Sequence, residues 1–158
     1  MKADIKNIQF FEGTPDRSDL ESWRSSGEHC VVILDDLMAK CSASQDISEL
    51  FTTFSHHMDI SVIFIVQNLF SAGKQFRTIS LNAHYFVLFK NKRDELQVQT
   101  FARQICPGNV KYFMSAYKLA TSPIHGSLLV DLSPNADPQY MLRSRILPGE
   151  TTIVYAPA

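Results

Sequence analysis

The sequence predicts an α/β fold with a mostly parallel sheet. Three apolar runs, at residues 30–34, 60–66 and 85–89, indicate strands. Continuous runs of β-branched and aromatic residues, without polar alternation, are typical of strands buried on both faces, as in parallel sheets. Segments with helical spacing separate or follow these runs, and strands that alternate with helices are the pattern of α/β proteins.

The other expected elements follow from periodicity and from capping and stop signals. A helix at 42–58 has a capping-box spacing at its start and apolar residues on one face. A helix at 94–105 ends before Pro107-Gly108. The remaining expectations are a strand at 5–11, a short helix or loop at 16–28, a loop carrying Gly73, Lys74 and Arg77, a helix at 109–120, a C-terminal β-hairpin of strands at 127–132 and 139–146, and an extended piece at 153–155.

Composition and charge limit the classes of protein to which the chain can belong. The chain has 158 residues, which fits one domain, and 45% of them are hydrophobic against 20% charged, as in ordinary globular proteins. This much apolar material argues against a disordered tail. The net charge is −1, so no global field attracts DNA or an anionic membrane. Any contact with nucleic acid would come from a local patch.

The sequence also predicts the compartment. No apolar run reaches the ~18–20 residues needed to cross a bilayer, and the first residues lack the apolar stretch of a secretory signal. The three cysteines are odd in number and show no C-x-x-C spacing, which argues against a disulfide framework and against a zinc finger. We therefore expect an intracellular protein, in the cytoplasm or nucleus, with free thiols and neither a membrane nor a disulfide partner.

Two carboxylates at the end of a predicted strand are the leading candidates for chemistry. Asp35 and Asp36 directly follow the apolar run at 30–34. In open α/β sheets, ligands bind at the carboxyl ends of the strands. One acid there suits a hydrated magnesium ion, and its neighbour suits the acceptance of a proton from an attacking water. An ordinary turn or cap role for these residues is the alternative.

Other polar residues near the predicted strand ends are weaker candidates. Gln67 and Asn68 follow the run at 60–66 and could orient a water or sense a terminal phosphate. Arg77, in the expected loop, could reach a phosphate in a neighbouring subunit as an arginine finger, although a solvated arginine is as good an interpretation.

Three further sequence patterns carry weaker or no signals of a site. Lys90, Lys92 and Arg93 form a small basic cluster that could touch a nucleic-acid backbone or simply be solvated. The histidines show no metal-binding spacing, and there is no G-x-S-x-G motif. Residues 68–75 come close to the G-x-x-x-x-G-K-[ST] motif of a phosphate-binding loop. Asn68 stands in place of the first glycine, and Gln75 in place of the serine or threonine whose hydroxyl binds magnesium, so we reject this match.

The motifs resemble one family. CVVILDDLM is similar to a Walker B segment. Together with the stretches at 56–94 and 107–132, it resembles the FtsK–HerA-type DNA-packaging ATPases of large DNA viruses, in the poxvirus-like branch and in Polinton-type elements and adintoviruses. The order and spacing of the three stretches make the resemblance more specific than the Walker B segment alone.

The resemblance implies an additional-strand P-loop NTPase with a RecA-like sheet, which forms a ring and drives double-stranded DNA into a capsid with ATP and Mg²⁺. On matching positions, Asp35 would hold magnesium through water and Asp36 would take the place of the catalytic glutamate. Asn68, with Gln67, would be the polar sensor, and Arg77 the finger acting in trans. If the protein is viral, the site of virion assembly is the implied location.

The chain departs from the family in lacking the strand and G-x-x-x-x-G-K-[ST] loop that precede Walker B. It therefore resembles a carboxyl-terminal fragment in which little remains to hold the β- and γ-phosphates, and we expect it to be inactive in isolation. In the family the missing strand lies between those at 60–66 and 85–89. Its loss would leave backbone groups unpaired, at a cost of ~1–3 kcal/mol for each buried group.

Two alternatives of other classes stay open. The first is a metal-dependent nuclease in which Asp35, Asp36 and Asp131 hold one or two divalent ions. The second is a non-catalytic interaction module derived from the ATPase, which binds intact subunits, or binds DNA through the basic cluster at residues 90–93.

Overall fold

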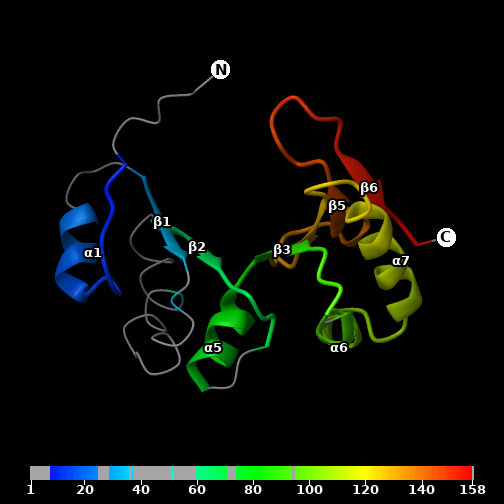
Figure 1. Ribbon diagram of the computed structural model, residues 1–158, viewed down its shortest axis with the longest axis horizontal. Helices are drawn as coiled ribbons and strands as arrows, with labels where there is room; N and C mark the ends of the chain where they lie inside the picture. The colour runs from blue at the N-terminus through cyan, green and yellow to red at the C-terminus, as the bar shows by residue number, and fades with distance from the viewer. Residues whose placement is uncertain are drawn as a thin grey trace. The chain divides into compact units, whose positions relative to one another are not determined.

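The structure, a computed structural model, divides the chain into two compact units (Figure 1). Unit 1 is residues 1–82 and unit 2 is residues 83–158. The described residues are 8–24, 29–35, 37, 51, 60–70, 74–93 and 95–157. Each unit is described by itself below, and the assignment of the whole chain to one domain stays a prediction.

Unit 1 contains a pair of parallel strands. Its elements are α1 (Arg17–Arg24), β1 (Cys30–Asp35), β2 (Ile60–Ile65) and α5 (Lys74–Asn82). The register runs from Cys30 opposite Ile60 to Asp35 opposite Ile65. The two strands expected at 30–34 and 60–66 are therefore confirmed, and they are neighbours. The short helix allowed at 16–28 is α1.

A reciprocal cap fixes the start of α1. The Asp16 carboxylate accepts hydrogen bonds from the Asp19 N–H (2.9 Å) and the Ser18 hydroxyl (2.6 Å), while the Asp16 N–H donates to the Asp19 carboxylate (3.0 Å). These bonds satisfy N–H groups that the first turn of a helix leaves without partners. The Ser18 and Asp19 bonds also hold the pKa of Asp16 below its usual value.

The parallel pair is buried on one face only. Val32 and Leu34 are buried, whereas Val31 and Ile33, which alternate with them, are 53% and 60% exposed. The buried face belongs to a core completed by Ile60, Phe51 and Ile79, and by partly buried side chains such as Trp23. The expectation of strands covered on both faces is wrong for β1 and β2, because the described elements supply a layer for one face alone.

Two other expectations for unit 1 fail in the described residues. Residues 8–11, the described part of the expected strand at 5–11, are not in a strand, and Phe10 is 93% exposed. The loop expected to carry Arg77 is largely helix α5. Phe76 and Ile79 stand at helical spacing, and burial of Ile79 in the core stabilises the helix. The helix expected at 42–58 lies outside the described residues, apart from Phe51.

Unit 2 is built on an antiparallel sheet with strand order β3-β4-β5-β6. The strands are β3 (Tyr85–Phe89), β4 (Ser127–Asp131), β5 (Leu142–Ser144) and β6 (Ile153–Tyr155). The strand expected at 85–89 and the C-terminal hairpin, β4 with β5, are confirmed, although a 3-10 turn, η2 (Pro138–Tyr140), shortens the second strand of the hairpin.

The expectation of a mostly parallel sheet is wrong for the described strands. Among the strands that the structure describes, only β1 with β2 is a parallel pair; β3 with β4, β4 with β5 and β5 with β6 are antiparallel. Short connections of the kind that follow β4 and β5 suit antiparallel neighbours, since a parallel crossover needs a dozen or more residues. The described architecture is α/β in composition, with a small parallel sheet and a larger antiparallel one.

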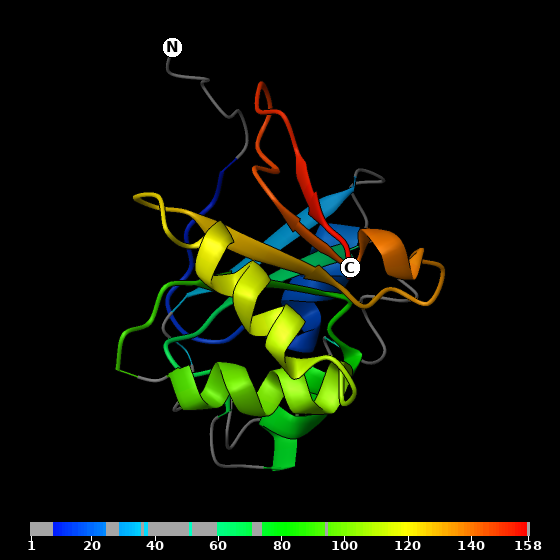
Figure 2. The ribbon, with the colours of Figure 1, turned by 90° about the vertical axis from the view of Figure 1, so that its right-hand side faces the viewer.

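Two helices cover one face of the unit 2 sheet, as Figure 2 shows. They are α6 (Glu95–Ile105) and α7 (Val110–Ala120), which confirm the helices expected at 94–105 and 109–120. The Phe101 ring lies 4.7 Å from that of Phe86 and 6.2 Å from that of Phe113, measured between centroids. Leu128 and Val130 of β4 are fully buried beneath this layer.

None of the helices in the described part of the chain has both the length and the apolarity needed to cross a bilayer. Cys30 and Cys106 are free thiols. Partial burial raises the pKa of the Cys106 thiol.

Candidate functional site

The carboxyl edge of the parallel pair carries an acid and two amides. Asp35 is the last residue of β1 and lies opposite Ile65, the last residue of β2. Gln67 and Asn68 follow shortly after Ile65, and the side chains of all three polar residues are exposed. Because the strands are parallel and in register, their polar ends leave the sheet at the same edge. Asp36, the expected base, lies outside the described residues.

Asp35 stands on the uncovered face of the sheet. It alternates with the buried Leu34 and so shares a face with Ile33, which is 60% exposed. An exposed carboxylate of this kind can hold a hydrated magnesium ion through its water shell, since Mg²⁺ usually keeps several waters and takes only one or two carboxylates. The described residues contain no cluster of three or more possible metal-binding side chains. Among the described residues, Asp35 is the one carboxylate at this edge, and water or phosphate oxygens could supply further ligands to a magnesium ion there.

Arg77 belongs to a helix rather than to a loop. It lies near the start of α5, and its side chain is exposed. A position on a helix restricts the reach of an arginine, because its backbone is fixed by the hydrogen-bond ladder. The role of Arg77 as a finger acting on a neighbouring subunit stays a prediction.

The rejected phosphate-loop match lies between β2 and α5. This order of strand, loop and helix is the context that a true phosphate loop requires. The sequence nevertheless places Asn68 and Gln75 where the motif needs glycine and a hydroxyl, and residues 71–73 lie outside the described part of the chain. The donor set for the β- and γ-phosphates of ATP is thus incomplete in the described residues, and the rejection stays a prediction.

Asp131, the third carboxylate of the nuclease hypothesis, is hydrogen-bonded and ion-paired to other residues of unit 2. Its Oδ1 accepts hydrogen bonds from the Ser133 N–H (3.1 Å) and hydroxyl (2.6 Å), and its Oδ2 pairs with the Arg143 guanidinium. Partial burial raises the pKa of Asp131, but the Ser133 bonds and the Arg143 charge outweigh this effect and leave the pKa below its usual value. A metal ion would have to compete with these partners. Asp35 belongs to unit 1 and Asp131 to unit 2, so a metal shared between them stays a prediction.

The basic cluster sits on a loop whose backbone is fixed. Lys90, Lys92 and Arg93 lie between β3 and α6, and their side chains are exposed. The hydroxyl of the buried Tyr117 donates to the Phe89 carbonyl (3.0 Å) and accepts from the Asn91 N–H (3.1 Å). Asn91 in turn accepts from the Arg93 N–H (3.0 Å) through its side chain. The loop is thus tied to α7 at the point where β3 ends.

The sequence predicted the helix that carries Tyr117 but not the role of its hydroxyl. A clue was available, since the hydroxyl of a buried tyrosine almost always finds a partner. What the sequence could not supply was the partner, because Phe89 and Asn91 are distant in the chain.

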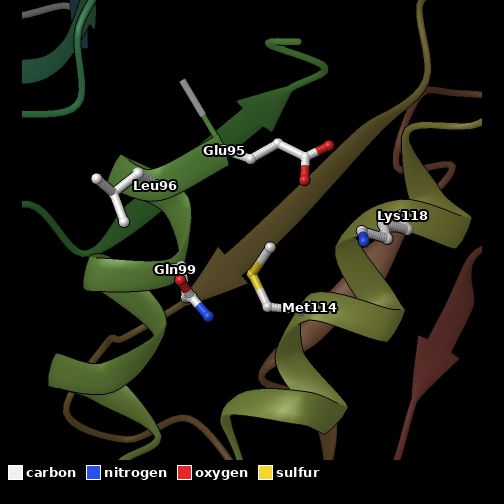
Figure 3. A pocket seen from close by; sticks show the side chains of 5 residues that line it. All are labelled: Glu95, Leu96, Gln99, Met114 and Lys118. Carbon is white, nitrogen blue, oxygen red and sulfur yellow. The ribbon is translucent and has the colours of Figure 1, made fainter. Parts of the chain in front are cut away.

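A shallow hollow of about 280 Å³ lies between α6 and α7 (Figure 3). Its lining residues are Glu95, Leu96, Gln99, Met114 and Lys118. Glu95 and Lys118 face it from the two helices, with Met114 between them. Its one carboxylate, Glu95, is exposed and belongs to no group of three or more possible metal-binding side chains in the described residues, so the hollow is a weaker candidate for chemistry than the carboxyl edge.

Comparison of the chain with protein-family models, with curated proteins and with solved structures found no match. The resemblance to the packaging ATPases therefore depends on the sequence motifs alone.

Proposed function

We propose that the chain is a carboxyl-terminal part of an FtsK–HerA-type DNA-packaging ATPase that cannot hydrolyse ATP by itself. The partners proposed with it are double-stranded DNA and like subunits in a ring. The observation that carries the proposal is the parallel, in-register pairing of β1 and β2, with Asp35 ending one strand and Gln67 and Asn68 following the other. A Walker B strand and its sensor strand need this arrangement to meet a nucleotide at one edge.

The break between the two sheets also supports the proposal. Among the described strands, β2 pairs only with β1, and β3 only with β4. Each therefore has one edge that no described strand covers. A central strand carrying the phosphate loop would pair with both edges, and these 158 residues contain no such loop.

The proposed roles follow the positions at the carboxyl edge. Bound Mg²⁺–ATP would supply the electrophilic γ-phosphate, and Asp35 would orient the metal through its water shell. Asp36 would accept a proton from the attacking water, Asn68 with Gln67 would hold that water, and Arg77 would neutralise phosphate charge in the next subunit. Without a backbone cradle and lysine for the phosphates, the nucleotide would be weakly held.

Nucleotide binding by the isolated chain tests the inactivity. In a titration with a fluorescent ATP analogue and Mg²⁺, we expect no saturation at micromolar concentrations. Micromolar binding together with ATP turnover that Asp36→Asn abolishes would contradict the proposed inactivity.

Co-assembly tests the family assignment. The chain is mixed with a complete packaging ATPase of the resembled family, and the masses of the rings are measured by native mass spectrometry. Mixed rings whose ATPase rate falls with the fraction of this chain are expected. Absence of mixed rings over a range of concentrations and nucleotide states would refute the assignment. Mixed rings with an unchanged rate would favour the non-catalytic interaction module instead.

A further inference from the structure

The face of the unit 2 sheet opposite α6 and α7 carries an exposed aromatic strand. Tyr85, Val87 and Phe89 of β3 are 57%, 45% and 61% exposed. They alternate with Phe86 and Leu88, of which Phe86 contacts α6 through Phe101. All three exposed side chains therefore lie on the face that the two helices leave uncovered. Large exposed apolar patches often mark binding sites, and three exposed apolar side chains in a row on one face make β3 a candidate surface of this kind.

Positive charge adjoins this aromatic strand. Lys90, Lys92 and Arg93 follow Phe89 directly, on the loop that Tyr117 fixes at the end of β3. We define the β3 platform as the exposed side chains Tyr85, Val87 and Phe89 together with these three cations.

Two described carboxylates near the β3 platform face other partners or surfaces, and Asp94, which follows Arg93, lies outside the described residues. Asp131, opposite Tyr85 in the sheet register, is paired with Arg143. Glu95, at the start of α6, faces the hollow between the helices, on the side where Lys118 lies (Figure 3). The platform thus offers aromatic faces at one place and exposed cations beside them.

We propose that the β3 platform binds single-stranded nucleic acid, with bases stacked on Tyr85 and Phe89 and phosphates held by Lys90, Lys92 and Arg93. Sheet surfaces with exposed aromatic residues bind unpaired bases by stacking, and nearby cations hold the backbone. Adjacent cations favour this ligand over a neutral apolar peptide, which would use the aromatic residues alone. A duplex cannot offer base faces, so it would engage only the cations.

The spacing of the two rings determines how a strand would lie. Tyr85 and Phe89 are four residues apart on a strand, or about 13 Å at ~3.3 Å per residue. Successive stacked bases are only ~3.4 Å apart. The rings would therefore engage non-neighbouring bases of an extended strand, which crosses Val87 and then reaches the basic loop.

Fluorescence anisotropy of the full chain with a labelled twenty-nucleotide oligothymidine tests the proposal. We expect binding that is tighter for the single strand than for a duplex of equal length. Phe89→Leu and Tyr85→Leu keep apolar bulk but remove the aromatic face, and each should weaken single-strand binding by about tenfold. Phe10→Leu, at an aromatic side chain 93% exposed in unit 1, is the matched control and should have no effect.

The cations are tested by the salt dependence of binding. Changing Lys90, Lys92 and Arg93 together to glutamine should make the negative slope of log K against log salt shallower by about 2, since each phosphate contact on a single strand contributes ~0.7 to its steepness. Lys111→Gln on α7 is the control and should leave the slope unchanged. Thermal unfolding of each variant confirms that it is folded.

Three results would overturn the proposal: no binding at low salt, equal binding of duplex and single strand, or aromatic variants that bind like the parent. The assay needs neither ATP nor ring assembly. Its failure is therefore distinct from failure of the proposed motor function.

Discussion

The Tyr117 hydroxyl is the most informative single atom to remove. Tyr117→Phe keeps the ring, which is 2% exposed, but removes the group that donates to the Phe89 carbonyl and accepts from the Asn91 N–H. Each hydrogen bond contributes about 1 kcal/mol net, and a buried backbone group left without a partner costs ~1–3 kcal/mol. We expect the free energy of unfolding to fall by about 2 kcal/mol.

Urea unfolding followed by circular dichroism measures this loss. With a typical dependence of ~1–3 kcal/mol per molar urea, the midpoint should fall by roughly 1 M. Tyr140→Phe is the matched control, because Tyr140 is 52% exposed, and its change should stay within ~0.5 kcal/mol. If Tyr117→Phe unfolds at the same midpoint as the parent, the hydroxyl does not hold the loop. The β3 platform would then lack its fixed basic end.

Three other substitutions test the packing and charge of unit 2. Leu128→Ala, at a fully buried side chain of β4, should lower the free energy of unfolding by about 2–5 kcal/mol in the same urea assay, and a loss below 1 kcal/mol would contradict the described core. Gly126→Ala should cost about 1–3 kcal/mol, because a Cβ there would lie 2.4 Å from the Ala120 carbonyl oxygen; an unchanged midpoint would show that the turn before β4 differs. Asp131→Asn should cost about 1.5 kcal/mol at pH 7, where the folded carboxylate is ionised and paired with Arg143. The pKa of Asp131 is lower in the folded protein than in the unfolded chain, so its ionised carboxylate stabilises the fold fully above the unfolded pKa near 3.9. This stabilisation is lost as the pH falls through the lower folded pKa, and the difference in unfolding free energy between variant and parent should therefore disappear below about pH 4. A difference that does not change with pH would refute the ion pair.

Periodicity predicted several elements because the preference that sets each one lies within a short segment. The run ending at Leu34 becomes a strand because its β-branched residues fit an extended, packed backbone. Helix α7, expected at 109–120, buries Phe113, Ala116, Tyr117 and Ala120, which stand at helical spacing. Helix α5 shows the limit of this reasoning, since Ile79 makes a helix favourable only when a core is present to receive it.

The candidate site was predictable in kind but not in arrangement. The sequence placed Asp35 and the amides at strand ends, and parallel pairing determined that these ends share an edge. It did not identify Arg77 as a helix residue, because α5 has only nine residues and buries Ile79 in a core formed by other segments of the chain. The sequence also could not show that Asp131 forms an ion pair with Arg143, which lies on the other strand of the hairpin.

By itself, the sequence predicted the strands β1 to β5, the helices α6 and α7 and the acid that ends β1, because local spacing and propensity act within a few residues. Only the tertiary structure decided which strands pair, in which direction, and which faces stay uncovered. Val87 and Leu88 are neighbours of similar chemistry, yet one is exposed and the other is buried. Strand pairing and the helix layer, formed by residues far away in the chain, set that difference.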